Sequence, residues 1–154
     1  TGRYAGEIRG FPYKCVRGCW VSRDCKIGNR KPRPGEKVYI GLAYNERARA
    51  SVNAERDGKI YPLIEWKIDE KTVINRLKDL NLYPPYYAQG FTRGGCWLCP
   101  KQPLKSLRLL WELYPELWEK LKFYQKQQAR GFRDDYTVFE LETKFKREYA
   151  GNPE

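Results

Sequence analysis

The sequence predicts an α/β fold, or an α+β fold for the isolated chain. We expect a few short strands, a helical C-terminal half, and a Cys-ligated metal centre that joins an N-terminal loop to a CxxC turn. Three observations lead to this prediction. Two short apolar runs lie within residues 37–66, residues 104–148 follow a helical hydrophobic period, and the five cysteines form two tight groups.

The composition is that of a globular chain. Of 154 residues, 41% are apolar and 32% charged, and no apolar run approaches the roughly 18 residues of a membrane span. Clustered cysteines in an odd number argue against a secreted disulfide scaffold. We therefore expect a single soluble, cytoplasmic domain with no membrane partner. Its expected regions are a basic Cys-containing loop region (1–36), a region of strands, helix and CxxC turn (37–100), and a helical C-terminal region (101–154).

Charge narrows the function classes. The net charge is +11, and residues 1–34 hold nine Lys and Arg residues against Glu7 and Asp24, a net of +7. This excess predicts an anionic partner at the N-terminal end, and a solvated basic loop is the alternative. The chain has no histidine, which excludes His-based acid–base catalysis, Ser-His-Asp triads and His-containing zinc sites.

The expected strands lie in the N-terminal half. Residues 1–18 are rich in glycine and should be loop, followed by a short helix over 20–27. Apolar residues between turn signals predict a strand at 37–44. They predict a second strand at 60–66, where Pro62 implies an edge strand or the strand's start.

The expected helices follow. Asp69 as N-cap predicts a helix of about a dozen residues that ends near Asn81, and residues 83–87 should form an ordered loop into the CxxC turn. Apolar residues recur at helical spacing over 104–128, where Pro115 should divide two helices whose stripe is core. A last helix is expected over 137–148, because Thr137 and Glu140 form a capping-box pattern.

Arg47 and Arg49 directly follow the first expected strand. Ligands of open α/β sheets bind outside the carboxyl ends of strands, so both guanidinium groups are candidates for holding a phosphate or sulfate. The alternative is the beginning of a surface helix with solvated arginines.

The cysteine pattern favours one metal centre. Cys96 and Cys99 form a CxxC turn after Gly94-Gly95, and a second group lies near the N-terminus: Cys15, Cys19 and Cys25. Cys₄ sites are commonly built from such pairs. The alternatives are a dithiol redox pair and two core cysteines. Four thiolates suit both zinc and a [4Fe–4S] cluster, and spacing alone does not separate these metals.

Four stretches of the chain form a series: Tyr39-Ile-Gly-Leu-Ala-Tyr-Asn-Glu-Arg-Ala-Arg49, Tyr61-Pro-Leu-Ile-Glu-Trp66, Gly95-Cys-Trp-Leu-Cys-Pro100, and Leu104-Lys-Ser-Leu-Arg108 with Tyr114-Pro-Glu-Leu-Trp118. In this order they resemble the C-terminal half of the phosphoadenosine-phosphosulfate (PAPS) reductase-like family of the PP-loop ATP pyrophosphatase superfamily. The resemblance spans about residues 12–148. The order of the four stretches strengthens the resemblance more than any single motif does.

One large departure accompanies this resemblance. The family's N-terminal half, with the Ser-Gly-Gly-x-Asp-Ser loop that holds the nucleotide phosphates, has no counterpart here, and Gly94-Gly95 is followed by cysteine. We therefore expect no ATP cleavage by this chain alone. The expected partner is a nucleotide-binding PP-loop half or subunit, or a second copy of the chain.

The resemblance also implies a ligand set. Iron–sulfur members of the family hold a [4Fe–4S] cluster with the CxxC and a cysteine pair ahead of the last core strand. This implies Cys96, Cys99 and Cys19 as ligands, although Trp20 stands where the adjacent second cysteine would be. Cys15 is the expected fourth ligand and Cys25 is assigned to the core, while Cys25 as fourth ligand and zinc as the metal stay open.

Two functions follow from these expectations. The resemblance implies an iron–sulfur component of a PAPS reductase-like oxidoreductase or sulfurtransferase that acts on an anionic substrate, a sulfonucleotide or a nucleic acid. No catalytic residue can be named. The alternative is a non-catalytic, Cys₄ metal-stapled nucleic-acid-binding or regulatory module, served by the basic N-terminal arm and by exposed Tyr83, Tyr86 and Tyr87.

Overall fold

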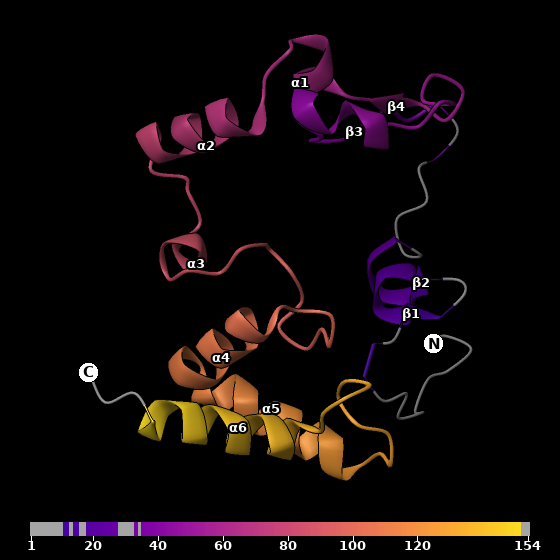
Figure 1. Cartoon of the computed structure of the whole chain (residues 1–154). Helices are drawn as coiled ribbons and strands as arrows, with labels where there is room; N and C mark the ends of the chain where they lie inside the picture. The colour runs from indigo at the N-terminus through magenta and orange to yellow at the C-terminus, as the bar shows by residue number, and fades with distance from the viewer. Residues whose placement is uncertain (1–10, 13, 16–17, 28–32, 34, 152–154) are drawn as a thin grey trace. The chain divides into compact units, whose positions relative to one another are not determined.

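The structure is a computed structural model that describes residues 11–12, 14–15, 18–27, 33 and 35–151, with the backbone alone for Lys14, Cys15, Gly18, Arg23, Lys26 and Ile27. The chain divides into two compact units (Figure 1). The helical unit comprises Thr1–Cys25 and Tyr86–Glu154, and the central unit is Lys26–Pro85. The described residues are mostly helical with a few short strands, so the predicted short strands and helical C-terminal half are present. That both units belong to one domain stays a prediction.

Three helices form the body of the helical unit: α4 (Leu104–Leu113), α5 (Pro115–Lys126) and α6 (Val138–Ala150). Pro115 separates the first two as predicted, because it occupies the first turn of α5, where a missing N–H breaks no helical hydrogen bond. The predicted capping box begins α6: the Glu140 backbone N–H donates to the Thr137 hydroxyl, and the Thr137 backbone N–H donates to the Glu140 carboxylate.

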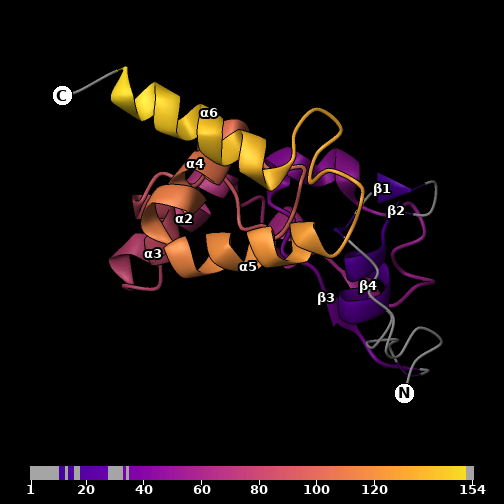
Figure 2. The same ribbon diagram turned by 90° about the horizontal axis from the view of Figure 1, so that it is seen from below.

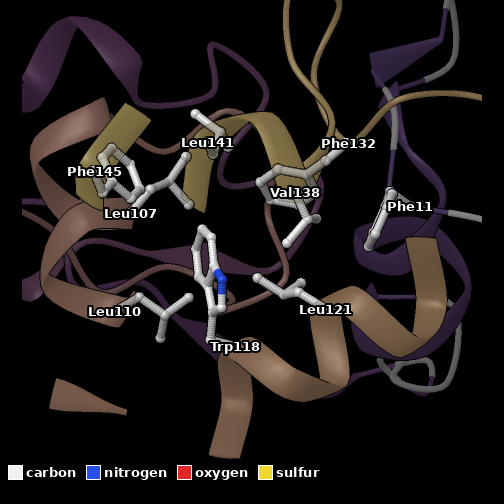
Figure 3. Packing of buried hydrophobic residues seen from close by; sticks show 9 residues of the cluster. All are labelled: Phe11, Leu107, Leu110, Trp118, Leu121, Phe132, Val138, Leu141 and Phe145. Carbon is white, nitrogen blue, oxygen red and sulfur yellow. The ribbon is translucent and has the colours of Figure 1, made fainter. Parts of the chain in front are cut away.

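The hydrophobic core of this unit lies between the three helices (Figure 3). Helix α5 contacts both α4 and α6 (Figure 2). Trp118 is 2% exposed, and its indole N–H lies 3.4 Å from the Glu142 carboxylate. The buried cluster consists of Phe11, Leu107, Leu110, Trp118, Leu121, Phe132, Val138, Leu141 and Phe145. The stripe predicted as core in α4 and α5 therefore lies there.

Phe11 anchors the N-terminal segment to this core. Its ring is 3% exposed and meets Phe132 edge-on, with ring centroids 4.8 Å apart. Its backbone N–H donates to Gln128 Oε1 at 3.1 Å, and the Trp20 indole N–H donates to the Phe11 carbonyl at 3.3 Å. Strand β1 (Lys14–Cys15) and strand β2 (Gly18–Cys19) then pair antiparallel, with Lys14 opposite Cys19.

The expected helix over 20–27 is present as the π-helix η1 (Val21–Ile27). The expectation of loop over residues 1–18 is met only in part, since β1 and the first residue of β2 fall within it. Residues 1–10, 13 and 16–17 of that expected loop lie outside the described residues.

The central unit contains a small parallel sheet rather than the long strand predicted at 37–44. Strand β3 (Val38–Tyr39) pairs with β4 (Lys59–Ile60), and the Ile40 backbone N–H adds a 2.8 Å bond to the Ile60 carbonyl. The chain then leaves the sheet and forms the 3₁₀ helix η2 (Tyr44–Arg49). Tyr39 is 69% exposed. Apolar residues favour a strand only where the pleated surface is covered, so their pattern overstated its length.

The predicted strand over 60–66 is wrong beyond Ile60. Residues Pro62–Glu65 form the short helix α1, with Pro62 in its first turn. Proline is as well suited to this position as to an edge strand, since its fixed φ is helical and its missing N–H is not needed.

Helix α2 (Glu70–Asp79) matches its prediction. Asp69 caps it, accepting a 2.7 Å hydrogen bond from the Thr72 backbone N–H, and Asn81 follows with a positive φ of 53°. The expected loop at 83–87 is partly helical, because Pro85 begins α3 (Pro85–Ala88). This is again proline at a helix start.

Candidate metal centre and adjoining cavity

The CxxC sequence forms a single tight turn in the helical unit. The Cys99 backbone N–H donates to the Cys96 carbonyl at 3.0 Å, and both cysteines are free and half-buried. Trp97 and Leu98 between them pack against the hydrophobic core, and the Trp97 ring stacks near Tyr124 with centroids 6.5 Å apart. The two thiols are therefore presented from one turn that the core holds in place.

A buried glutamine fixes the backbone of this turn. Gln102 is 7% exposed, and its Nε2 donates to the Cys96 carbonyl at 3.0 Å and to the Trp97 carbonyl at 2.9 Å. Arg133 adds hydrogen bonds from Nη1 to the carbonyls of Pro100, at 3.1 Å, and Gln102, at 2.9 Å. Two side chains thus hold four carbonyls, which restricts the conformations open to the turn.

Arg133 itself is oriented by Asp135. Its Nε donates to Asp135 Oδ1 at 3.0 Å, and this hydrogen bond lowers the pKa of the Asp135 carboxyl.

The roles of Gln102 and Arg133 were not predicted from the sequence. Arg133 lies about thirty residues beyond the turn in sequence, and no local spacing rule links an arginine to a carbonyl at that separation.

The N–H groups of the turn are available. Within the described part of the chain, the backbone N–H groups of Gly95, Cys96, Trp97 and Leu98 donate to no acceptor. Consecutive backbone N–H groups of this kind donate to thiolates, cluster sulfurs or anions. The turn therefore combines two thiols, tied carbonyls and free donors.

The N-terminal cysteines belong to the same unit as the turn. Cys19 is half-buried and Cys25 is exposed, so the assignment of Cys25 to the core is wrong. It lies in η1, on a side that the core does not cover. The Cys15 side chain lies outside the described residues, and among those described no three His, Cys, Asp or Glu side chains gather as a metal site. The four-cysteine ligand set stays a prediction.

A cavity of about 370 Å³ adjoins the CxxC turn within the helical unit. Its wall combines aromatic rings, two aliphatic side chains and the polar groups that precede the turn. The lining residues are Tyr86, Phe91, Arg93, Gly94, Gly95, Trp97, Gln102, Leu110, Tyr114 and Leu117. Its size falls in the range of small-ligand pockets, roughly 300–1,000 Å³.

Two tyrosines close over Gly94 at one side of this cavity. The rings of Tyr86 and Tyr87 lie 4.3 Å apart, and the Gly94 backbone N–H donates to the Tyr87 hydroxyl at 3.1 Å. A Cβ at Gly94 would come within 2.7 Å of the Tyr86 hydroxyl, whereas a Cβ at Gly95 would meet its nearest neighbour at 3.8 Å. An alanine at Gly94 would therefore displace the Tyr86 hydroxyl, whereas an alanine at Gly95 would meet no close neighbour.

The three tyrosines expected at the surface are half-buried instead. Tyr86 and Tyr87 belong to the helical unit, and Tyr83 lies in the central unit, where Lys78 Nζ sits 5.2 Å from its ring centroid. Arg93 is exposed and pairs with no carboxylate of the described residues. It is the cationic group of the cavity wall.

The predicted anion site lies in the central unit, on η2. Arg47 places its guanidinium 4.7 Å from the Tyr44 ring centroid and donates from Nη1 to the Tyr44 carbonyl at 3.3 Å. Arg49 forms an ion pair with Glu46. Both arginines are exposed. Arg47 keeps donors free for an anion, whereas a ligand of Arg49 would compete with Glu46.

Comparison with known proteins finds two longer relatives. Over 126 residues, 74% of this chain, it is 29% identical to "Uncharacterized protein MJ0973" of Methanocaldococcus jannaschii. Over 125 residues, 72% of this chain, it is 24% identical to "Uncharacterized protein MJ0066" of the same organism. The match covers 30% of the first relative and 25% of the second, so the chain spans less than a third of their length. No family model and no solved structure matches the chain.

No helix of the described residues combines the length and the apolarity that a membrane span requires.

Proposed function

We propose that this chain is the iron–sulfur component of a PAPS reductase-like sulfur-metabolism or sulfur-transfer enzyme. The clamped CxxC turn carries this proposal. Its carbonyls are bound by Gln102 and Arg133, and its N–H groups are free within the described residues. A [4Fe–4S] cluster is held by thiolates and tuned by donors to its sulfurs, so this donor set fits the cluster.

The proposed ligands come from the two chain segments that form the helical unit. Cys96 and Cys99 supply two thiolates, and half-buried Cys19 is the third ligand. Cys15 remains the fourth ligand of the proposal, and exposed Cys25 competes with it for that place. Zinc held by four thiolates is the alternative metal. When bound, an iron–sulfur cluster supplies electron transfer beside this turn.

Metal analysis of anaerobically purified protein tests this proposal. We expect visible absorption together with iron and acid-labile sulfide, whereas zinc would leave the protein colourless. Because metal binding contributes on the order of 10 kcal/mol to folding in small Cys₄ sites, Cys96→Ser and Cys99→Ser should lose metal and become insoluble or unfold. Metal-free wild-type protein with the stability of Cys96→Ser would refute the proposal.

The matched pair Cys15→Ser and Cys25→Ser assigns the fourth ligand. Loss of metal in the first variant and retention in the second would support Cys15. The opposite result would move the ligand to Cys25, whose side chain is exposed and accessible.

We propose further that the nucleotide-binding half is supplied by a PP-loop region or subunit, or that a second copy covers the central unit. Two features support this. The sheet of the central unit has only β3 and β4 among the described residues, and Tyr39 is 69% exposed. Uncovered strand edges favour pairing with another chain. A stable monomer of the pure chain at micromolar concentration in sedimentation would count against both partners.

The second candidate is a nucleic-acid-binding module in which the metal is only a staple. Its supporting observations are the net charge of +7 in residues 1–34 and the aromatic cavity beside the turn. Nucleic-acid affinity that falls steeply with salt would favour this candidate, provided that folded metal-ligand variants retain it.

A further inference from the structure

The cavity beside the CxxC turn has no role in the metal proposal. We infer that it binds one unstacked base of a single-stranded nucleic acid, with the adjoining phosphate held at Arg93 and the free N–H groups of the turn. This inference rests on the second candidate function, nucleic-acid binding, and not on the metal. It assigns a specific site to that function.

The aromatic wall suits a base. Tyr86, Phe91, Trp97 and Tyr114 line the cavity, and Leu110 and Leu117 complete its apolar surface. The Tyr114 hydroxyl is engaged with Gln89 Oε1 at 2.6 Å, which leaves its ring as the surface for contact. Aromatic side chains bind unstacked bases through their π-faces, whatever the base. A cavity of about 370 Å³ accommodates a single base.

Gln102 provides a polar group for the base edge. Its Nε2 is engaged with the carbonyls of Cys96 and Trp97, and its Oε1 accepts no hydrogen bond from a described residue. Gln102 is 7% exposed and lines the cavity, and the two hydrogen bonds of its Nε2 fix the position of its side-chain amide. The exocyclic amino groups of adenine, cytosine and guanine are donors that fit this acceptor.

The polar end of the cavity suits a phosphate. Arg93 has no carboxylate partner among the described residues, and the backbone N–H groups of Gly95 and Trp97, which both line the cavity, donate to no described acceptor. A guanidinium binds phosphate through paired hydrogen bonds, and consecutive backbone N–H groups form anion-binding concavities. A base and its phosphate are thus matched by the two ends of one cavity.

Charge favours a strand over a free nucleotide. Residues 1–34 carry a net of +7, far more than one phosphate requires, and each phosphate contact adds to the affinity of a polyanion. A duplex is disfavoured, because its bases are stacked and would have to be extruded before one could enter.

Fluorescence anisotropy with labelled single strands of about ten nucleotides tests the inference. Arg93→Ala should weaken binding about tenfold and reduce the slope of log affinity against log salt by about 0.7, the value for one phosphate on a single strand. Lys120→Ala on α5 removes an exposed charge outside the cavity in the same unit and should change neither quantity. Equal effects of both variants would overturn the inference.

A glycine pair tests the aromatic wall. Gly94→Ala displaces Tyr86 and should weaken binding, whereas Gly41→Ala in the central unit, where an added Cβ meets nothing within 4 Å, should leave binding unchanged. Trp97→Ala should weaken binding about tenfold or more, and Trp97→Phe should restore most of it because the π-face returns. Circular dichroism of each variant confirms that it folds. Folded Gly94→Ala and Trp97→Ala proteins with wild-type affinity would overturn the inference.

Two further ligands distinguish the possible failures. Adenosine monophosphate that competes as well as the strand would exclude the strand as the ligand. A duplex that binds as tightly as the single strand would exclude the unstacked base. Wild-type protein that binds no single strand would refute the nucleic-acid function together with the cavity, while the metal analysis would stand independently.

Discussion

The helical unit and the central unit bury their apolar residues to very different extents. The helical unit has a contiguous cluster of nine buried apolar residues. In the central unit, the apolar residues among those described that are buried are Ala43 and Tyr61. Because burial of apolar surface is the main favourable term in folding, the helical unit can hold its own fold. The fold of the central unit depends more on turns, on helix caps and on any partner that covers its exposed apolar residues.

The same difference separates the two candidate sites. The CxxC turn rests on the core and is tied by buried Gln102, so its geometry is fixed before any ligand binds. Arg47 and Arg49 stand on an exposed 3₁₀ helix that contains no buried residue. Fixed geometry suits metal ligands, whereas an exposed arginine pair gains its order from the ligand or partner that it binds.

Two tryptophans provide the largest test of this comparison. Trp118→Ala leaves a cavity in the core of the helical unit and should lower the free energy of unfolding by about 3–5 kcal/mol. Trp66→Ala in the central unit removes a side chain that is 67% exposed and should change it by less than about 0.5 kcal/mol. Urea unfolding followed by circular dichroism measures both. Similar losses would show that Trp66 is covered in solution, by a partner or a second copy.

The elements that sequence reasoning found are those specified by local rules. Asp69 caps α2, Pro115 separates α4 from α5, and Thr137 with Glu140 begins α6. Each depends on residues within one helical turn, so a pattern a few residues long is enough.

The strand predictions were wrong where strand formation depends on the rest of the chain. Residues 37–44 fit a covered strand, but only Val38 and Tyr39 pair, with a partner strand about twenty residues away. Pro62 fits both an edge strand and a helix start, and the structure uses the second. Local sequence leaves such choices open, because side-chain packing decides them.

The candidate site could likewise be predicted only in the part that depends on neighbouring residues. The CxxC turn is visible in the sequence, whereas the hydrogen bonds of Arg133 to its carbonyls arise only when the loop before α6 packs beside it. The cavity likewise combines Tyr86 and Leu117, which no spacing rule connects. Sequence alone supplies the reactive atoms, and tertiary structure supplies their surroundings.

The next largest expected effect is a loss of anion affinity when the arginines of η2 are replaced. If Arg47 holds a phosphate or sulfate, Arg47→Ala should lose about 1.5–3 kcal/mol of binding free energy, measured by calorimetry with sulfate or a nucleotide. Arg49→Ala should lose less, because Glu46 already neutralises its guanidinium. Arg56→Ala, an exposed arginine beside Asp57 in the same unit, is the control. Equal affinity in all three variants would make Arg47 and Arg49 solvated surface.

The smallest expected effect is a difference between two helix caps in acid. Hydrogen bonds from the Thr72 side chain and backbone N–H lower the pKa of Asp69 at the start of α2. Hydrogen bonds from the Thr137 backbone N–H and hydroxyl likewise lower the pKa of Glu140 at the start of α6. The folded chain therefore binds fewer protons than the unfolded chain at these sites. Their stabilisation is complete above the ordinary carboxyl pKa values of 3.8 and 4.5, and it is lost as pH falls through the lower folded values.

Both helices lose a cap in acid, but the consequence should differ between the units. Helix α2 contains no buried residue, whereas α6 buries Val138, Leu141 and Phe145. We therefore expect the amide protons of α2 to lose protection from hydrogen exchange at a higher pH than those of α6. Asp69→Asn and Glu140→Gln keep a hydrogen-bond acceptor without a titrating group, so each should flatten the pH dependence of its own helix. Simultaneous loss of protection in both helices would mean that the two units unfold as one cooperative body, and the contrast between them would then lie in the core alone.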